Sequence, residues 1–275
     1  MPLTIDLHTH MKVAKRTPMQ AGEPARFARI LQRRGIHALA IAEHAHAPDL
    51  WQMFDALRAQ FIYEHGRFIV GPSLFYTGVE ITLAERADAV VLGDLEDIRA
   101  LDNAFDFPLS AGYHPEGAEL ADVTARLGSL AVIAAHPLRE DKPIGALGGD
   151  TVARLFDAVE INARWSDPDT VARVERIARG LGVGLTGGSD AHVWLQTGAA
   201  WTHVDAASDR ADDVLEAIRL GRCRAALRPD AEHICRLGSE LKASLKASLP
   251  RLDALPPTRL EPVIVRRHTH ALLGV

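Results

Sequence analysis

LTIDLHTH, residues 3–10, is a short apolar run that ends in a His-X-His pair. Side chains alternate in a strand, so His8 and His10 point to the same side and present two imidazoles together. Other apolar runs of the chain also end in residue types that bind metal ions. These run ends are Glu43-His44, Glu80, His136-Pro137, Glu160 and Asp190-Ala191-His192.

Short apolar runs alternate with helical periodicity along most of the chain, which predicts an α/β fold with a parallel sheet covered on both faces. About seven such units are present, enough to close a barrel. The predicted strands are Leu3–Leu7, Ala38–Ala42, Leu74–Ile81, Val90–Leu92, Leu130–Ala135, Ala158–Ile161, Val183–Thr186 and Ala200–Val204. The predicted helices are Pro24–Arg34, Leu50–His65, Glu116–Leu127, Pro168–Leu181 and Ala211–Leu220. Because barrel sites lie at the carboxyl ends of the strands, the metal-binding residue types are expected to converge there.

The pattern changes after about Arg228. Asp230–Leu249 predicts an amphipathic helix with basic residues on one side, and prolines break the sequence that follows. We therefore expect a barrel over residues 1–228 and, over residues 229–275, an appendage of helix plus tail that is not an independent domain. This appendage packs on the barrel or forms an oligomer contact, and the sequence does not decide between the two.

The composition narrows the class of partner. The formal net charge of −5 predicts no broad basic surface for nucleic acid. No apolar run is long enough to span a bilayer, and no signal-peptide pattern opens the chain, so a cytoplasmic location without a membrane partner is expected. The two cysteines, Cys223 and Cys235, have no zinc-site spacing and are predicted to be reduced thiols.

Six motifs in order, spread over residues 3–225, resemble those of the PHP (polymerase and histidinol phosphatase) superfamily, and in particular its small metal-dependent phosphoesterases. The motifs are Asp6-Leu7-His8-Thr9-His10, Ala42-Glu43-His44, Gly78-Val79-Glu80-Ile81-Thr82, Ala134-Ala135-His136-Pro137, Val159-Glu160-Ile161-Asn162 and Gly187-Gly188-Ser189-Asp190-Ala191-His192. The resemblance implies a distorted (β/α)7 barrel, related to the TIM barrel, that holds two or three divalent metal ions.

The resemblance also implies a ligand set. A first metal site matches His8, His10, Glu80 and Asp190. Glu80 bridges to a second ion that His136 also binds, and His44 and His192 match a third site. Glu160, Asp88 and Glu43 are expected to contact the ligands rather than the metal. Imidazole and carboxylate together do not select among zinc, manganese and iron.

Two departures from the family pattern concern the ligands. A histidine is usual about nine residues after the bridging glutamate, where this chain has Ala89 with Asp88 beside it. A histidine or acidic residue is also usual shortly after the His-X-His pair, where this chain has the stretch from Met11 to Arg16. Asp88 could replace the first ligand, and His46 or His114 the second. Two ions are favoured over three, because a charged lysine has no lone pair to offer a metal.

The chemistry implied is that of a metal-dependent hydrolase. It is expected to release phosphate from a small phosphorylated metabolite or nucleotide through a metal-bound hydroxide. Arg139 is the foremost candidate to stabilise the phosphoryl charge, with Lys15 and Arg164 as further candidates. His192 or His44 would protonate the leaving group if either is not bound to metal.

Two other functions remain open from the sequence. Metal-bound hydroxide also attacks C–N and carboxylic ester bonds, so a hydrolase of that kind is the alternative enzyme. A metal-binding module without catalysis is the alternative outside enzymes. The sequence leaves open whether the chain forms a homo-oligomer.

Overall fold

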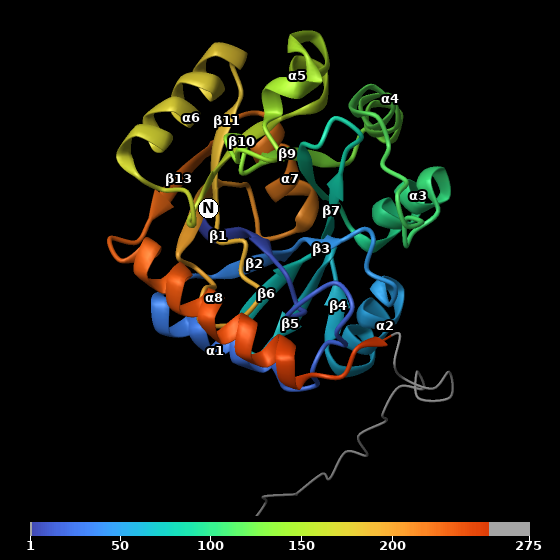
Figure 1. Cartoon of the computed structure of the whole chain (residues 1–275), viewed down its shortest axis with the longest axis vertical. Helices are drawn as coiled ribbons and strands as arrows, with labels where there is room; N and C mark the ends of the chain where they lie inside the picture. The colour runs from blue at the N-terminus through green and yellow to red at the C-terminus, as the bar shows by residue number, and fades with distance from the viewer. Residues whose placement is uncertain (1, 253–275) are drawn as a thin grey trace, which may run out of the picture.

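A computed structural model describes residues 2–252 as a mixed α/β fold (Figure 1). The strands are β1 (Pro2–Thr9), β2 (Ala38–Ile41), β3 (Glu43–His44), β4 (Ile62–Glu64), β5 (Arg67–Val70), β6 (Ser73–Tyr76), β7 (Gly78–Thr82), β8 (Asp88–Leu92), β9 (Ala131–Ala135), β10 (Ala158–Asn162), β11 (Gly184–Gly188), β12 (Ala200–Asp205) and β13 (Cys223–Leu227). The helices are α1 (Glu23–Arg34), α2 (Leu50–Gln60), α3 (Leu95–Phe105), α4 (Gly117–Leu127), α5 (Gly149–Leu155), α6 (Pro168–Leu181), α7 (Ala211–Arg219) and α8 (Ala231–Ser248), with a 3-10 turn over Ile144–Leu147.

The strands form two sheets, with the orders β13-β12-β1-β2-β6-β5-β4 and β11-β10-β9-β8-β7-β3. The chain passes from the first sheet to the second twice, between β2 and β3 and between β6 and β7. At another boundary, Thr9 forms an isolated parallel bridge with Ala191. The sheets therefore approach each other at the ends of β1, β2 and β11, where the candidate ligands lie.

The sheets are mixed rather than parallel, which corrects the prediction from the sequence. Strand β8 runs antiparallel to both β7 and β9, and β1 runs antiparallel to β12. Continuous apolar runs indicate burial on both faces, and burial does not fix strand direction. The mixed α/β class is confirmed. The described strands do not join into one hydrogen-bonded ring, so closure of the expected (β/α)7 barrel stays a prediction.

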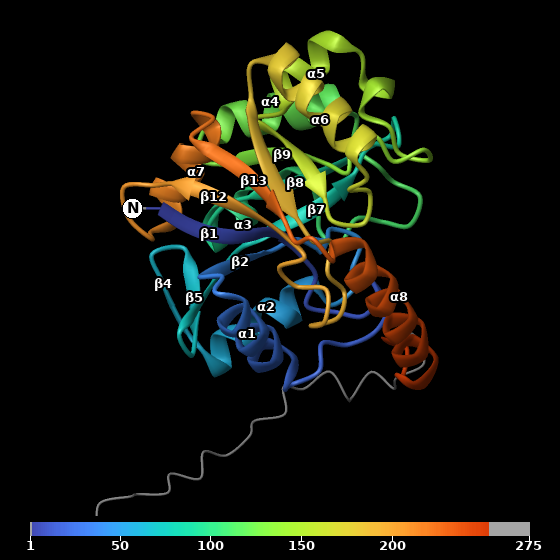
Figure 2. The same ribbon diagram turned by 90° about the vertical axis from the view of Figure 1, so that its left-hand side faces the viewer.

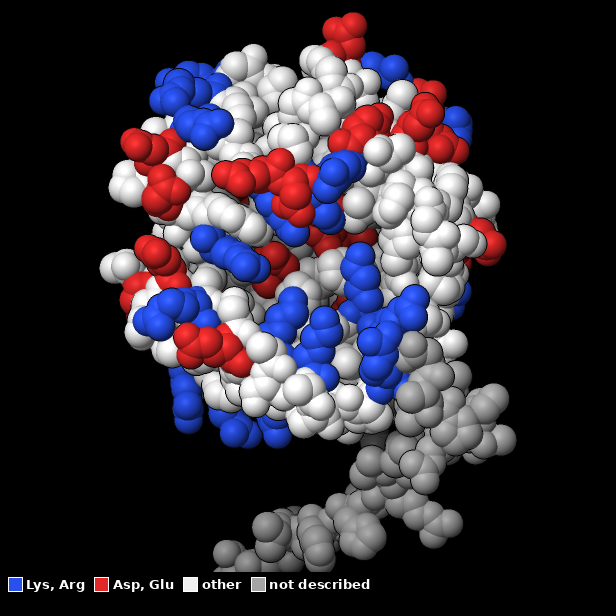
Figure 3. All heavy atoms as spheres, in the orientation of Figure 1, with Lys and Arg blue, Asp and Glu red and all other residues white. Residues whose placement is uncertain are grey.

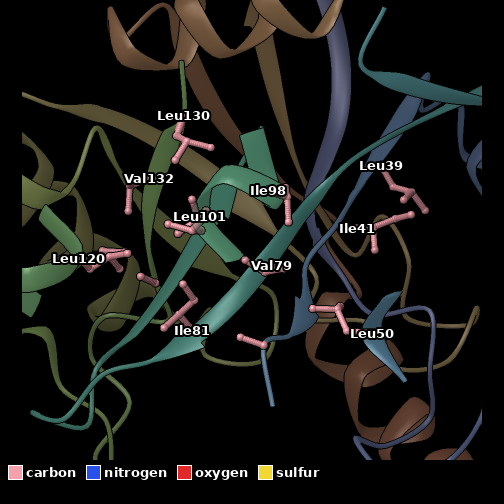
Figure 4. Close-up of a cluster of buried hydrophobic side chains, with 14 of the residues drawn as sticks. Leu39, Ile41, Leu50, Val79, Ile81, Ile98, Leu101, Leu120, Leu130 and Val132 are labelled. Carbon is pink, nitrogen blue, oxygen red and sulfur yellow. The ribbon is translucent and has the colours of Figure 1, made fainter. Parts of the chain in front are cut away.

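Helices cover the sheets on opposite sides, with α1 and α2 on one side and α4, α5 and α6 on the other (Figures 1 and 2). Leu39, Ile41, Val79, Ile81 and Val132 from the strands pack with Leu50, Ile98, Leu101 and Leu120 from α2, α3 and α4 (Figure 4). Val79 and Ile81 alternate with Glu80 along β7, so the face of β7 that carries Glu80 is opposite to this apolar cluster.

Helix α6 shows how local sequence sets an element. Asp167 precedes it and accepts a hydrogen bond from the backbone N–H of Thr170 (3.0 Å), and Pro168 occupies the first turn. Gly182 ends the helix with φ of 70°, a left-handed conformation that glycine adopts without strain. The structure confirms the predicted bounds of this helix.

Two predicted elements are divided in the structure. The predicted strand Leu74–Ile81 is two strands, β6 and β7, which belong to different sheets. The predicted helix Leu50–His65 ends at Gln60, and β4 then forms a hairpin with β5. His65 and Gly66, at the hairpin turn, both have positive φ (51° and 76°), as a two-residue turn of type I′ requires.

Helix α8 confirms the helix expected near Asp230–Leu249. Its buried residues Ala231, Ile234 and Cys235 pack against Ala163, Ala199 and Ala200. Beyond it, the backbone N–H of Leu252 donates to the carbonyl oxygen of Arg16 (2.8 Å). The rest of the expected tail, residues 253–275, lies outside the described residues. Both cysteines are free, as predicted. Within residues 2–252, no helix has the length and apolar character needed to cross a membrane.

Candidate metal centre

The candidate ligands gather at one edge of the sheets because they occupy corresponding strand ends. His8 lies near the end of β1 and His10 just after it, His44 ends β3, and His136 follows β9. Asp190 and His192 follow β11, and Glu80 lies in β7. The structure brings all seven predicted ligands together in three groups, two of which share His10. These groups are His8, His10 and Asp190; Glu80, Asp88 and His136; and His10, His44 and His192.

The first group joins the end of β1 to the loop after β11. Nε2 of His10 lies 3.1 Å from Oδ1 of Asp190, and Nε2 of His8 lies 3.8 Å from the same oxygen. Both imidazoles also face Glu80, with nitrogen–oxygen distances of 3.7 Å for His8 and 3.8 Å for His10. This arrangement matches the expected first site of His8, His10, Glu80 and Asp190.

The second group contains Asp88, the residue beside the missing histidine. Nε2 of His136 lies 3.3 Å from Glu80 and 3.5 Å from Asp88. Asp88 pairs with Thr82 and Ala135 across the antiparallel strands, which places it at the edge where β7 and β9 end. Ala89 points to the opposite face and is fully buried in the apolar cluster. Asp88 therefore lies in a candidate ligand group, where it could replace the missing histidine.

The ammonium group of Lys142 also contacts Asp88. Nζ of Lys142 donates to both carboxylate oxygens, at 2.8 and 2.6 Å. The carboxylate is fully buried, so this cation offsets much of the cost of burying its charge. A metal ion at the second group would compete with Lys142 for the same two oxygens.

The third group consists of three imidazole rings that contact one another at tilted angles. The ring centroid of His10 lies 4.4 Å from that of His44 and 4.1 Å from that of His192. His10 therefore completes this candidate group with His44 and His192. It takes the place of the ligand that the stretch from Met11 to Arg16 does not supply. His46 and His114 do not replace it, since they stack on each other at 4.8 Å and bond to the carbonyl oxygens of Tyr113 and Thr82.

Glu160 holds two ligands in place without joining a group. Its Oε1 accepts a hydrogen bond from Nδ1 of His8 (2.9 Å), and its Oε2 accepts one from the backbone N–H of His136 (2.7 Å). The bond to Nδ1 leaves the lone pair of His8 on Nε2, which points at the cluster. Glu43 lies on the other side of His10 from Asp190. Its carboxylate is 3.8 Å from Nδ1 of His10, too far for a hydrogen bond.

The donor set fits divalent cations. Nε2 of His8, which faces the carboxylates of Glu80 and Asp190, is buried and has no hydrogen-bond partner among the described residues. Burial opposes the charged form of His8, yet the carboxylates of Glu160, Asp190 and Glu80 outweigh burial and raise its pKa to about 10. The cluster therefore attracts positive charge, and an unpartnered imidazole nitrogen beside carboxylates provides a lone pair that a cation needs.

The protonation of His44 differs from that of His8. Burial and the neighbouring charge of His10 lower the pKa of His44 to about 4, and burial likewise lowers the pKa of His192. Both imidazoles are thus neutral near pH 7, the form that binds metals.

The turns that carry His136 and Asp190 are strained. These residues have φ of 30° and 50°, in the left-handed region that side chains with a Cβ rarely adopt. Such strain is concentrated at functional sites, where the surrounding structure enforces it.

Asp6 is a site residue that the analysis of the sequence missed. Its buried carboxylate accepts hydrogen bonds from the backbone N–H of Ser189 (3.0 Å), the hydroxyl of Ser189 (2.5 Å) and the backbone N–H of Gly198 (2.7 Å). Burial raises the pKa of Asp6 to about 6, against the effect of these bonds. Asp6 thus ties β1 to the loop that carries Asp190. Its place two residues before His8, on the same side of the strand, was the available signal.

The predicted phosphate-binding residues lie outside the three groups. Arg139 forms two hydrogen bonds with Asp141 (2.7 and 3.0 Å) and lies over the ring of Trp165. Arg164 lies over the same ring, 5.2 Å from its centroid. Lys15 contributes its carbonyl oxygen to the ammonium group of Lys12, which also pairs with Asp49.

The family model described as PHP-associated (PHP_C) matches residues 170–223, from α6 to the start of β13. This match and the ordered ligand motifs are both similarities to the PHP superfamily.

Three solved structures have a fold similar to that of this chain. PsfC from Pseudomonas syringae PB-5123 aligns with a TM-score of 0.73 at 22% identity over 89% of this chain and 99% of its own. The lesion-specific endonuclease PfuEndoQ from Pyrococcus furiosus aligns with a TM-score of 0.62 at 16% identity, over 80% of this chain and 56% of its own. A two-domain protein from Bacteroides vulgatus, which contains a predicted PHP-like metal-dependent phosphoesterase, aligns with a TM-score of 0.59 at 17% identity, over 86% of this chain and 70% of its own. A search of the curated proteins found no match.

Proposed function

We propose that this protein is a PHP-like metal-dependent phosphoesterase that hydrolyses a small phosphorylated metabolite or nucleotide. The observation that carries the proposal is the convergence of seven candidate imidazole and carboxylate ligands, with Asp88, in three groups, two of which share His10. His8, His10, Glu80 and Asp190 would hold one ion, and Glu80, Asp88 and His136 a second. His44 and His192 would complete the environment of a third ion with His10. The clusters suit zinc, manganese or iron.

When bound, paired divalent ions neutralise phosphoryl charge and make an attacking water available at neutral pH. The chain's own residues would supply position and charge around them. Glu160 orients His8, and Asp6 fixes the loop of Asp190. Arg139 and Lys15 would serve as cations for the equatorial phosphoryl oxygens, whereas Arg164 lines a pocket with Asp190 and His192. We assign His44 and His192 first to metal binding, because both belong to a candidate ligand group.

For Arg139, the proposal requires an exchange of partner. Its guanidinium is paired with the exposed Asp141. Exposed ion pairs contribute about 0–1 kcal/mol, so a phosphate could displace Asp141 at small cost. A phosphoryl dianion would offer Arg139 the same two-oxygen contact.

A panel of substrates tests the proposal. The protein, stripped with a chelator and reloaded separately with zinc, manganese or iron, is assayed on phosphate monoesters, phosphate diesters, carboxylic esters and amides. We expect metal-dependent phosphate release. Turnover only of amides or carboxylic esters would favour the alternative hydrolase, and bound metal without any turnover would favour a non-catalytic metal-binding module.

Substitution of a ligand provides the matched control. His10→Ala should lose metal and activity together, since His10 belongs to two of the ligand groups. His37→Ala is the comparison, because His37 is exposed and its imidazole contacts Thr4, outside the three ligand groups. Full activity in His10→Ala would contradict the assignment.

The similarity to an endonuclease adds a DNA substrate to the panel. PfuEndoQ is described as an endonuclease, and its relative was solved with a 27-mer duplex that contains an abasic lesion. The expectation that this chain has no broad nucleic-acid surface is therefore tested with the same duplex. A cytoplasmic location also stays a prediction.

A further inference from the structure

Helix α8 lies at the side of the molecule towards which β1 runs (Figure 2). It approaches the loop after β11 very closely at Gly238. A Cβ added to Gly238 would meet Cγ of Gln196 at 2.2 Å, and Oε1 of Gln196 accepts a hydrogen bond from the backbone N–H of His192 (3.1 Å). The helix backbone is therefore held next to the segment that carries two of the ligands.

One turn beyond Gly238, α8 places Lys242 in a pocket beside the metal centre. The pocket is open to solvent, and its lining includes Lys242 from α8, Arg164 from the loop after β10, and the ligands Asp190 and His192. Lys242 is partly buried, whereas Lys246, one turn further along α8, is exposed. Figure 3 shows lysine and arginine side chains around a hollow near the middle of this face, with acidic side chains inside it.

Among the described residues, neither cation in this pocket has an ionic partner. The side chains of Lys242 and Arg164 form no hydrogen bond or ion pair with any residue in the range 2–252, and Arg164 only stacks on Trp165. Burial lowers the pKa of Lys242, while the charge of Asp190 opposes that effect. A partly buried ammonium group is costly without a partner, so its position calls for an explanation.

Neutralisation of Asp190 does not explain Lys242. The carboxylate of Asp190 is within 4.0 Å of His8, His10 and His192, and Lys242 is not among these partners. Two divalent ions and Lys142 would bring five positive charges to the five carboxylates of Glu43, Glu80, Asp88, Glu160 and Asp190. The loaded centre would then be close to neutral, and the pair of cations beside it would still need an anion.

We propose that Lys242 and Arg164 bind a second anionic group of the substrate, a carboxylate or a second phosphate, while the phosphoryl group to be removed lies at the metal centre. This inference rests on the proposed phosphoesterase function and names its substrate class as small phosphate esters with a further acidic group. Arginine binds two oxygens of such a group at once, and lysine provides a compact charge.

Two compounds with the same carbon skeleton test the inference. 3-Phosphoglycerate has a carboxylate where glycerol 3-phosphate has a neutral hydroxymethyl group. Kinetics of both are measured for the wild-type protein, for Lys242→Met, which keeps the apolar stem of the side chain, and for the control Lys246→Met. We expect wild type to prefer 3-phosphoglycerate. Lys242→Met should raise the KM for 3-phosphoglycerate about tenfold and leave glycerol 3-phosphate within twofold, the effect of one lost bond to a charged group. Lys246→Met should change neither.

A binding measurement separates this inference from the proposed function. Both compounds are titrated calorimetrically into the metal-loaded protein, with circular dichroism to confirm that each variant is folded. If neither compound is hydrolysed but Lys242→Met still weakens binding of 3-phosphoglycerate alone, the hydrolase proposal fails and the anion site stands. Equal losses for both compounds, no loss for either, or no preference of the wild-type protein for 3-phosphoglycerate in binding would overturn the anion site.

Discussion

Asp88 shows how a single position in a strand decides whether a residue can reach a metal. The alternation of side chains directs Asp88 towards Glu80 and His136, and Ala89 towards the apolar cluster. The sequence showed that a histidine was missing and that Asp88 was adjacent. It did not show which of the two positions faces the site, because the direction and pairing of β8 were not known.

Replacement of Asp88 is expected to remove one ion. Asp88→Ala should bind about one metal ion fewer per chain than wild type, because the second group would retain only Glu80 and His136 as ligands. Elemental analysis after dialysis measures this. Asp122→Ala, which removes an exposed carboxylate paired with Arg154, is the control and should keep the full metal content. An unchanged metal content in Asp88→Ala would show that Asp88 is not a ligand.

Asp6 is expected to contribute to stability rather than to chemistry. Asp6→Ala would leave the Ser189 and Gly198 donors buried without an acceptor, and each such group costs about 1–3 kcal/mol. Urea unfolding should show a loss of at least that size, whereas Asp205→Ala, at the exposed end of β12, should lie within about 0.5 kcal/mol of wild type. Equal stability of the two variants would contradict this role.

At the scale of elements, a boundary with a signal in the local sequence was easier to predict than a boundary that depends on tertiary packing. Helix α6 has a capping aspartate, an early proline and a final glycine, so its bounds follow from local sequence. The run Leu74–Ile81 gives no such signal at Thr77, where β6 passes into β7. The division depends on Gly78, whose Cα comes so close to the carbonyl oxygen of Val91 that a Cβ would lie 2.6 Å from it. That approach is tertiary and cannot be inferred from periodicity.

Strand β11 provides a second close approach that can be tested. A Cβ at Gly188 would meet Oε1 of Glu160 at 2.0 Å and Cβ of His8 at 2.6 Å. Gly188→Ala should therefore lower the free energy of unfolding by about 1–3 kcal/mol and weaken metal binding, because Glu160 must move away from His8.

The matched control for Gly188→Ala is Gly180→Ala. Gly180 lies in α6, where an added Cβ would meet no atom within 4 Å. This variant should be more stable than wild type by about 0.5–1 kcal/mol, since alanine restricts the unfolded chain and favours the helix. Urea unfolding and metal titration of both variants provide the measurements. If Gly188→Ala changes neither the free energy of unfolding nor metal binding, β11 accommodates the added methyl group without strain.

At the scale of the whole molecule, the mixed α/β class and the convergence of the ligands were predictable, but the sheet arrangement was not. The positions of Glu80, His136 and Asp190 after apolar runs placed them at strand ends, and strand ends meet at an edge. The division into two sheets depends on the hairpins β4–β5 and β7–β8, which reverse the chain. For β4–β5 the signal was His65-Gly66, a two-residue turn that resembles the end of a helix.

The packing of α8 and β13 predicts that neither cysteine reacts readily. Burial raises the pKa of Cys223 to about 11 and that of Cys235 to about 12. The thiolate is the reactive form, so at pH 8 both groups are almost wholly protonated, and reactivity should rise as pH approaches those values. A chromogenic disulfide reagent at pH 8 should react slowly with the native protein and promptly with two thiols in urea. Fast reaction of one thiol in the native protein would show that α8 does not cover Cys235 as described.

The contact of His10 with Asp190 spans 180 positions of the chain. During translation, the His-X-His pair leaves the ribosome long before the aspartate that completes its first ion site. A nascent chain therefore holds only half of that site until the last strand of its sheet has emerged. The group of Glu80, Asp88 and His136 is complete once His136 has emerged, so the two groups would gain their ions at different stages of synthesis.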